Sequence, residues 1–328
     1  MSESRSSVLD GWRGISITLV LLGHLFPLGL KSWQLNSTVA AAGMAIFFIL
    51  SGFLITSLLL RDQNIKHFLI RRFLRIVPLA WLAIIVSLLA FNANQQLYLA
   101  HLLFYVNLTP ELLTNYTAHL WSLCVEMQFY VAIALLVGLF KEKAFWLLPL
   151  LALCVTLNRY ANGIEMTITT YHRVDEILAG TLLALINHSA YDHAKRLIAK
   201  LPLLIMFGFL LVSTHPNSGL FNYLRPYIAM LMIGSTLFAS QYQTADKMLD
   251  KWYTPLLNSR ILFYLASISY ALYVIHGILA NTWLGEGMTL EKYLKRPLLL
   301  TVTFALAHIS TFYYEKYWIN LGKKLTSK

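Results

Sequence analysis

Two ionisable side chains lie inside an otherwise apolar stretch, residues 9–28, near the start of the chain. Arg13 and His24 are eleven residues apart, about three helical turns, so both would leave one face of a helix roughly 16 Å apart. A span of about 30 Å would then place Arg13, with Asp10, near one water interface and His24 near the midplane. An ionisable group at that depth is a candidate for function, whereas a histidine bonded to a neighbouring helix would be purely structural.

A second polar stripe consists of His119, Ser122, Glu126 and Tyr130, which recur at spacings of three and four and therefore share one helix face. A buried carboxylate needs a partner or keeps its proton. If Glu126 shared a cavity with His24, the carboxylate would orient and charge a histidine base.

Two further apolar runs carry isolated polar groups. Arg173 and Glu176 stand at the head of one run, and Tyr273 and His276 share one face of another. For Glu126 the alternative to a role in chemistry is an ion pair with Arg173 that serves only to assemble the helices. Polar stripes on several otherwise apolar helices indicate a polar cavity within a helical bundle.

A basic cluster precedes the third apolar run, in the stretch KHFLIRRFLRIVP. Arg72 and Arg75 are three residues apart on one helix face, with Arg71 beside them. Two guanidinium groups so placed can bind a phosphate or diphosphate together. The alternative is an ordinary topology signal in contact with lipid headgroups.

The composition places the chain among membrane proteins. Its 328 residues are 58% hydrophobic and 12% charged, with a mean hydropathy of +0.61, whereas a soluble domain carries about 25% charged residues. The net charge of +11 lies in short clusters between apolar runs, a pattern typical of cytoplasmic loops and anionic lipid rather than of nucleic-acid binding. The two cysteines offer no disulfide framework, and no metal site is predicted.

Apolar runs recur along the chain, at residues 12–30, 38–60, 72–91, 97–108, 119–140, 144–158, 174–188, 197–213, 224–240, 259–283 and 297–319. The fourth run, about a dozen residues, is too short to cross a bilayer unaided. We therefore predict an all-α, polytopic transmembrane helical bundle of about ten spanning helices plus one short non-spanning segment. No linker marks a second domain, so residues 1–328 are expected to form one.

Basic residues between the runs bear on this count. Ten crossings place both termini and the main basic clusters in the cytoplasm, as the positive-inside rule requires. Two loops fit less well, one with Arg159 and Arg173 and one with residues 292–296. No small-residue cleavage site follows the first run, so we expect a retained first helix. The main clusters are Arg61, Lys66, Arg71, Arg72 and Arg75; Lys141 and Lys143; Lys195, Arg196 and Lys200; Lys247, Lys251 and Arg260; and Lys323, Lys324 and Lys328.

The ordered motifs LDGWRGISITLVLLGH, FFILSGFLIT, IRRFLRIVP, HLWSLCVEMQFY, RVDEILAGTLLA, SYALYVIHG and YYEKYW cover nearly the whole chain. With them the chain resembles the acyltransferase-3 family, integral membrane acyltransferases that modify bacterial surface sugars. The chain departs from the family pattern at three positions, where Cys124, Met127 and Ile275 replace a usual Ser, Glu and Trp. Met127 and Ile275 could alter the acceptor pocket.

The resemblance implies roles for particular residues. Arg13 and His24 are the expected catalytic pair, with Glu126 assisting them. The expected donor-binding residues are Arg71, Arg72, Arg75, Ser51, Gly52 and Phe53. Residues expected around the acceptor are Asp10, His119, Trp121, Ser122, Tyr130, Arg173, Glu176, Tyr273 and His276.

The expected reaction is transfer of an acyl group, most simply acetyl, from cytoplasmic acetyl-CoA to a hydroxyl of a cell-surface or lipid-linked carbohydrate, with no bound cofactor. His24 would act as base or become acylated itself. The expected location is the bacterial inner membrane, in contact with lipid and, where transfer needs them, polysaccharide-biosynthesis partners. The alternatives are a proton-coupled transporter, for which no matching halves are found, and a non-catalytic subunit of a polysaccharide machine.

Overall fold

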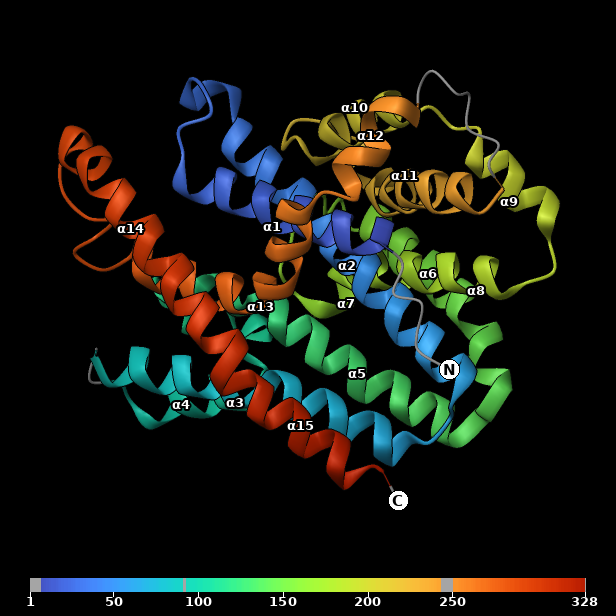
Figure 1. Ribbon diagram of the computed structural model, residues 1–328, viewed down its shortest axis with the longest axis horizontal. Helices are drawn as coiled ribbons and strands as arrows, with labels where there is room; N and C mark the ends of the chain where they lie inside the picture. Colours follow the sequence, from blue (N-terminus) through green and yellow to red (C-terminus); the bar gives the residue numbers. More distant parts are fainter. Residues whose placement is uncertain (1–6, 91–92, 243–249, 328) are drawn as a thin grey trace. The chain divides into compact units, whose positions relative to one another are not determined.

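The computed structural model describes residues 7–90, 93–242 and 250–327, and within these ranges every regular element is helical. Lys247 and Lys328, counted above among the basic residues, lie outside the described ranges. The helices (Figure 1) are α1 (Ser7–Leu25), α2 (Leu35–Arg61), α3 (Ile65–Ala90), α4 (Gln95–Leu102), α5 (Trp121–Phe140), α6 (Ala144–Ala161), α7 (Thr170–Arg173), α8 (Asp175–His188), α9 (Asp192–Ala199), α10 (Leu203–Thr214), α11 (Phe221–Tyr242), α12 (Asp250–Leu257), α13 (Arg260–Ala280), α14 (Thr289–Ile309), the π-helical η6 (Ser310–Glu315) and α15 (Lys316–Leu325).

Six helical segments of the described residues are long and apolar enough to cross a membrane, or seven if one bent pair counts as a single span. The predicted count of ten is therefore not confirmed. One of the six segments, Ala118–Ala161, contains both α5 and α6, which are separated at Lys141 (φ 53°). By contrast α8 has only 14 residues, about 21 Å of helix, which is shorter than a hydrocarbon core of about 30 Å. The short fourth run is confirmed as short, because α4 has eight residues.

The run predicted at 197–213 is interrupted. Its residues divide between α9 and α10, whose axes differ by 83°. Pro202 stands at the junction with extended backbone (φ −72°, ψ 117°). A proline disfavours helical backbone in the residue before it, so the helix cannot continue through this point.

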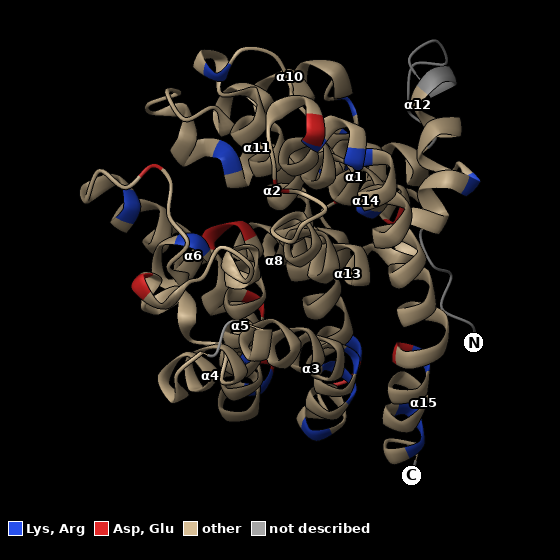
Figure 2. Ribbon diagram, turned by 90° about the vertical axis from the view of Figure 1, so that its left-hand side faces the viewer, with Lys and Arg blue, Asp and Glu red and all other residues tan. Residues whose placement is uncertain are grey.

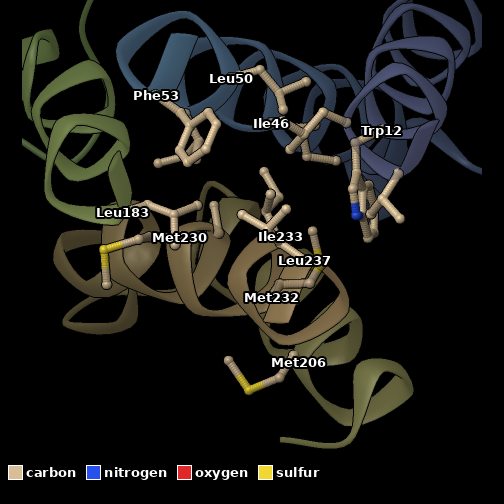
Figure 3. Close-up of a cluster of buried hydrophobic side chains, with 14 of the residues drawn as sticks. Trp12, Ile46, Leu50, Phe53, Leu183, Met206, Met230, Met232, Ile233 and Leu237 are labelled. Atoms are coloured by element: carbon tan, nitrogen blue, oxygen red, sulfur yellow. The ribbon is translucent and has the colours of Figure 1, made fainter. Parts of the chain in front are cut away.

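The chain forms two compact units, the first of which contains Met1–Arg61, Glu142–Thr167 and Val174–Ser267. In this first unit, α2 packs against α1, α8, α10 and α11. Buried apolar side chains from these helices form the core (Figure 3), including Trp12, Ile46, Leu50, Phe53, Leu183, Met206, Met230, Met232, Ile233 and Leu237. The Trp12 indole also donates to Thr236 Oγ1 at 2.8 Å, which fixes α1 to α11.

Glycines allow α2 and α8 to approach closely. A Cβ at Gly52 would overlap the carbonyl oxygen of Ile177, and one at Gly180 would overlap that of Ile49. Small residues at helix contacts are the usual means of tight packing in membrane bundles, where apolar side chains gain little by leaving lipid.

The second unit contains Asp62–Lys141, Ile168–Arg173 and Ile268–Lys328. Here α3 packs against α4, α5 and α15, and α14, η6 and α15 follow one another as a nearly continuous helical run (Figure 1). The α3–α15 contact is antiparallel, because Tyr314 donates to Pro78 O at 3.3 Å and Arg71 Nε donates to Thr326 Oγ1 at 2.7 Å.

Charged residues are sparse on the ribbons (Figure 2), and two that fitted poorly as topology signals are buried. Arg159 pairs with Asp175 at 2.5 Å, and both side chains are fully buried in the first unit. Arg173 is 3% exposed, and its guanidinium carbon lies 5.5 Å from the ring centroid of Trp121 in the second unit. These arginines are used inside the protein, so they carry no information about the side of the membrane.

We predict that Gly180→Ala destabilises the protein by about 3 kcal/mol, because overpacking costs about 1–3 kcal/mol and the obstacle here is backbone, which cannot rotate away. The matched control is Gly208→Ala on α10, where a Cβ meets nothing within 4 Å. Thermal unfolding in detergent measures both variants. Equal unfolding midpoints for the two variants would show that the close approach of α2 and α8 does not require a glycine at position 180.

Candidate functional site

His24 lies in the last turn of α1 and is exposed, not in the middle of a longer span as predicted. The helix ends at Leu25 because Pro27 follows closely and disfavours helical backbone in Phe26, and because Gly29 adopts φ +92°. The hydrophobic run continues beyond this point, which is why the sequence placed His24 deeper.

Asn36, in the first turn of α2, holds the end of α1. Its Nδ2 donates to Gly23 O at 2.7 Å and to Phe26 O at 2.6 Å, and its Oδ1 accepts from Leu28 N at 3.2 Å. These bonds satisfy carbonyls that a helix end leaves without a helical partner. Asn36 therefore orients the turn that carries His24, a role that no sequence pattern indicated.

Arg13 lies about 16 Å along α1 from His24. Its Nη1 is 3.5 Å from Oδ1 of Asp10, one turn earlier on the same helix. Asp10 is buried, whereas the Arg13 side chain is 20% exposed. The Arg13 guanidinium therefore neutralises the buried Asp10 carboxylate while remaining partly accessible at the protein surface.

Ser51, Gly52 and Phe53 are all buried on α2. Gly52 lies against the α8 backbone and Phe53 belongs to the hydrophobic core shown in Figure 3. Helix packing explains Gly52 and Phe53 by itself. Their predicted contact with a donor stays a prediction.

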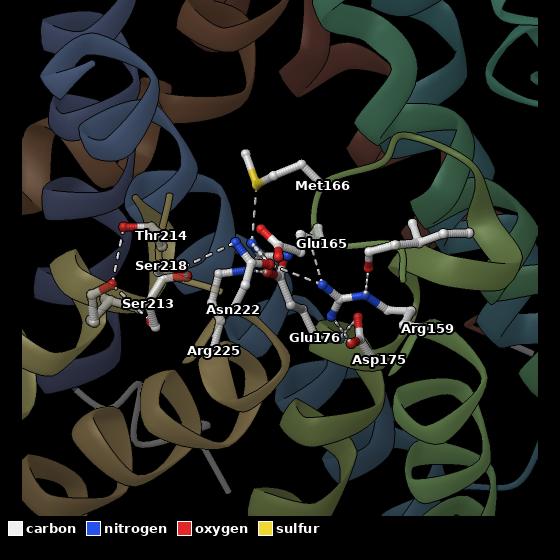
Figure 4. A network of polar contacts seen from close by, with 12 residues as sticks. Arg159, Glu165, Met166, Asp175, Glu176, Ser213, Thr214, Ser218, Asn222 and Arg225 are labelled. Atoms are coloured by element: carbon white, nitrogen blue, oxygen red, sulfur yellow. Dashed lines mark hydrogen bonds and ion pairs between the residues drawn. The ribbon is translucent and has the colours of Figure 1, made fainter. Parts of the chain in front are cut away.

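Two adjacent acids at the start of α8, Asp175 and Glu176, belong to a fully buried ionic network (Figure 4). Arg159 from α6 pairs with Asp175 at 2.5 Å, and Arg225 from α11 pairs with Glu176 at 2.5 Å. Asn222 Oδ1 accepts from both arginines, at 3.0 and 2.9 Å. All five residues are fully buried.

The sequence reading placed Glu176 near the acceptor but missed Arg225. The signal was present, because Arg225 is an ionisable residue inside the predicted run 224–240 and such residues normally have a partner. The partner itself comes from another helix, so spacing along the chain does not reveal it.

In the second unit, α5 and α13 bring four predicted residues together. The Tyr273 hydroxyl donates to the backbone oxygen of His119 and lies 2.6 Å from Ser122 Oγ. The rings of His119 and His276 are 5.1 Å apart between centroids. Gly277 lies against the His119 ring and leaves no room there for a side chain.

Backbone carbonyls fix the tautomers of the two histidines when they are neutral. His119 Nε2 lies 3.0 Å from Val274 O, and His276 Nδ1 lies 2.8 Å from Tyr273 O. A carbonyl accepts only, so each of these nitrogens carries the proton. The basic lone pair is then on Nδ1 of His119 and on Nε2 of His276.

Glu126 and Tyr130 are buried one turn apart on α5, and the Tyr130 hydroxyl donates to Glu126 Oε1. The spacing had placed them on one face, which the hydrogen bond confirms. Trp121 and Arg173 are also brought together by their cation–π contact.

The three arginines of α3 differ in their surroundings. Arg71 and Arg75 are exposed and Arg72 is partly buried. Arg71 bonds to Thr326, the residue that follows α15. Successive helix positions are 100° apart, so Arg71 and Arg72 face different directions.

Glu315 is a buried acid, although it stands beside Lys316 in the sequence. It is 6% exposed and accepts from Ser310 Oγ at 3.1 Å and Thr311 Oγ1 at 3.0 Å. All three belong to η6, and π-helical turns often occur at functional sites.

Outside the candidate spans, His101 on α4 is buried as a neutral ring. Its Nδ1 lies 2.8 Å from Leu97 O and its Nε2 lies 2.7 Å from Thr117 Oγ1. Burial lowers the pKa of His101, and the bond to the Leu97 carbonyl opposes this shift only in part. His101 therefore ties α4 to the segment before α5 rather than carrying charge.

No group of three or more His, Cys, Asp or Glu side chains suited to a metal ion occurs in residues 7–90, 93–242 and 250–327.

Residues 7–318 match the sequence model of a family described as an acyltransferase domain. A protein of Staphylococcus aureus (strain COL) named as a putative O-acetyltransferase is 24% identical over 315 residues, covering 82% of this chain and 49% of that protein. No solved structure matches the chain.

Two relatives carry the name of a substrate. A Bacillus subtilis (strain 168) protein named as a putative peptidoglycan O-acetyltransferase is 29% identical over 234 residues, covering 59% of this chain and 35% of that protein. A peptidoglycan O-acetyltransferase of Listeria monocytogenes is 29% identical over 151 residues, covering 38% and 22%. The chain spans about half the length, or less, of these three relatives.

We predict that Arg159→Met destabilises the protein by about 3–5 kcal/mol, because it leaves Asp175 buried without its cation. The double variant Arg159→Met/Asp175→Leu should recover most of the loss, since no charge then remains to be neutralised. Thermal unfolding measures the difference.

Arg196→Met is the control for this pair, because Arg196 is an exposed arginine of the same unit. Its effect should stay within about 0.5 kcal/mol. A double variant no more stable than the single one would show that Arg159 contributes something other than neutralisation.

Proposed function

The chain belongs to the acyltransferase-3 family of membrane acyltransferases, and on that premise we propose that it transfers an acetyl group from acetyl-CoA to a hydroxyl of a cell-surface or lipid-linked carbohydrate. The proposal rests on the family match, which covers residues 7–318 and so includes every residue that is assigned a role below. Homologues named O-acetyltransferases favour it over a transporter.

His24 is the proposed base for the acceptor hydroxyl, or the group that is acylated and passes the acyl on. Its exposed position at the end of α1 supports access by a large acceptor, and Asn36 would hold the turn in place. Arg13 would stabilise negative charge on the donor, with Asp10 orienting its guanidinium.

The proposed donor site uses Arg72 and Arg75, whose guanidinium groups suit the phosphates of a coenzyme A thioester. Arg71 already bonds to Thr326, so the proposal depends chiefly on the other two arginines. Ser51 would contribute through its hydroxyl and Gly52 and Phe53 through the packing of α2.

The acceptor is proposed to be a carbohydrate, as in the relatives named for peptidoglycan. His119, Ser122, Tyr273 and His276 form a preorganised set of donors and acceptors of the kind that recognises hydroxyl groups. Glu126, with Tyr130, would position the sugar.

We also propose the bacterial inner membrane as the location, with both termini in the cytoplasm. The basic ends of α3 and α15 support this orientation by the positive-inside rule. Acyl-CoA would then approach from the side on which it is made.

His24→Ala is expected to lower the rate of transfer by about 10²–10⁴-fold, the usual contribution of a general base, without loss of folded protein. The assay is incorporation of labelled acetyl from acetyl-CoA into membrane glycan, with the added mass identified by mass spectrometry. His193→Ala, an exposed histidine of α9, is the control. A near-normal rate in His24→Ala would remove His24 from the chemistry.

Arg72→Gln and Arg75→Gln should each raise KM for acetyl-CoA by about tenfold while changing kcat little, because a bond to a charged group contributes about 1.5–3 kcal/mol. Arg260→Gln, an exposed arginine of the first unit, should leave KM unchanged. An unaltered KM in both α3 variants would contradict the donor assignment.

A further inference from the structure

An apolar groove of about 950 Å³ runs along the second unit. Its lining comes from α3, the end of α4 and the turn after it, α5, η6 and α15. From Phe73 to Ile85, the lining residues of α3 extend over about 18 Å at 1.5 Å per residue. One leaflet of a bilayer is about 15 Å deep in hydrocarbon, so the groove has the length of a lipid tail.

The groove offers little for a polar ligand to bind. Trp81 Nε1 donates to Leu102 O at 3.0 Å, Gln128 Nε2 to Phe104 O at 2.7 Å, and Tyr314 OH to Pro78 O at 3.3 Å. These polar groups hold the walls together and are not directed at a ligand. A sugar or a nucleotide bound here would leave its own polar atoms without hydrogen-bond partners, which costs free energy. A hydrocarbon chain has no such atoms and avoids this cost.

The walls are held in place before any ligand binds. Phe104 adopts φ +55° at the end of the groove, a conformation that costs free energy for a bulky residue. The hydrogen bond from Gln128 to its carbonyl holds that turn, and Thr170 Oγ1 donates to Gln128 Oε1 at 2.6 Å. Hydrogen bonds, and not side-chain packing alone, therefore hold this end of the groove in its concave shape.

The opposite end of the groove is basic. One turn before Leu74, the first turns of α3 carry Arg71, which bonds to Thr326 at the end of α15. Lys323 and Lys324 precede Thr326 and are exposed. The only acid in η6 and α15, Glu315, is buried and accepts bonds from its own segment.

We propose that this groove binds an anionic phospholipid from the leaflet that contains the basic end, with one acyl chain along α3 and α5 and the phosphate near Arg71, Lys323 and Lys324. Basic pockets beside membrane helices select anionic headgroups in this way. The lipid would add to the packing of α15 against α3 and to the Arg71–Thr326 bond. The proposal is independent of the acyl-transfer chemistry.

The experiment is native mass spectrometry of the whole protein, purified in detergent and offered phosphatidylglycerol or phosphatidylethanolamine. We expect preferential retention of phosphatidylglycerol. Lys323→Gln/Lys324→Gln should lower that affinity by about fivefold per charge and leave binding of phosphatidylethanolamine unchanged. Equal retention of the two lipids by wild-type protein would show that the groove does not select an anionic headgroup, and would overturn the proposal.

Two matched controls separate charge from shape. Lys292→Gln/Arg296→Gln removes the same charge from the start of α14 and should have no effect. Ala132→Trp fills the groove on α5 and should reduce retention of both lipids, whereas Ala305→Trp on the exposed side of α14 should not.

If Ala132→Trp binds phosphatidylglycerol as wild type does, the tail does not lie in the groove. If a polyprenyl phosphate displaces phosphatidylglycerol at equal concentration, the assignment to phospholipid is wrong. Unfolding midpoints, measured with and without lipid, confirm that each variant is folded.

Discussion

Neutralisation of two adjacent buried carboxylates, Asp175 and Glu176, is the constraint on which the first unit depends. Each must meet a cation, because an unpaired charge in an apolar interior costs several kcal/mol. Arg159 reaches one from α6 and Arg225 reaches the other from α11, while Asn222 joins the two arginines. This network fixes the rotation of three helices about their axes, since a turned helix would withdraw its charge.

Close backbone contacts then set how near these helices lie. Gly52 and Gly180 let α2 and α8 meet without side chains between them, and α1 is held to α2 by the bonds of Asn36 and to α11 by Trp12. The end of α1 is therefore a rigid support for His24 although the residue itself is exposed. Sites on helices that are locked by packing keep their geometry better than sites on loops.

In the second unit, the arginines of α3 differ in their surroundings. Near the start of α3, Arg72 is partly buried and Arg75 is exposed, while Arg71 bonds to Thr326 at the basic end of the groove. Polar residues of α5 and α13 are linked to each other by short hydrogen bonds and backbone carbonyls. The proposed donor binding and the proposed lipid contact would therefore use different faces of the same helices.

Hydropathy and spacing predicted an all-helical chain, the short fourth run and the shared face of Glu126 and Tyr130, because local periodicity records which residues share a face. The family was predicted from the ordered motifs, and the number of spans was not settled by hydropathy. Tertiary structure decided where α1 ends relative to His24, which arginines neutralise α8, and that Glu315 is buried. A charge in an apolar run shows that a partner must exist, but only the packing of distant helices selects which residue it is.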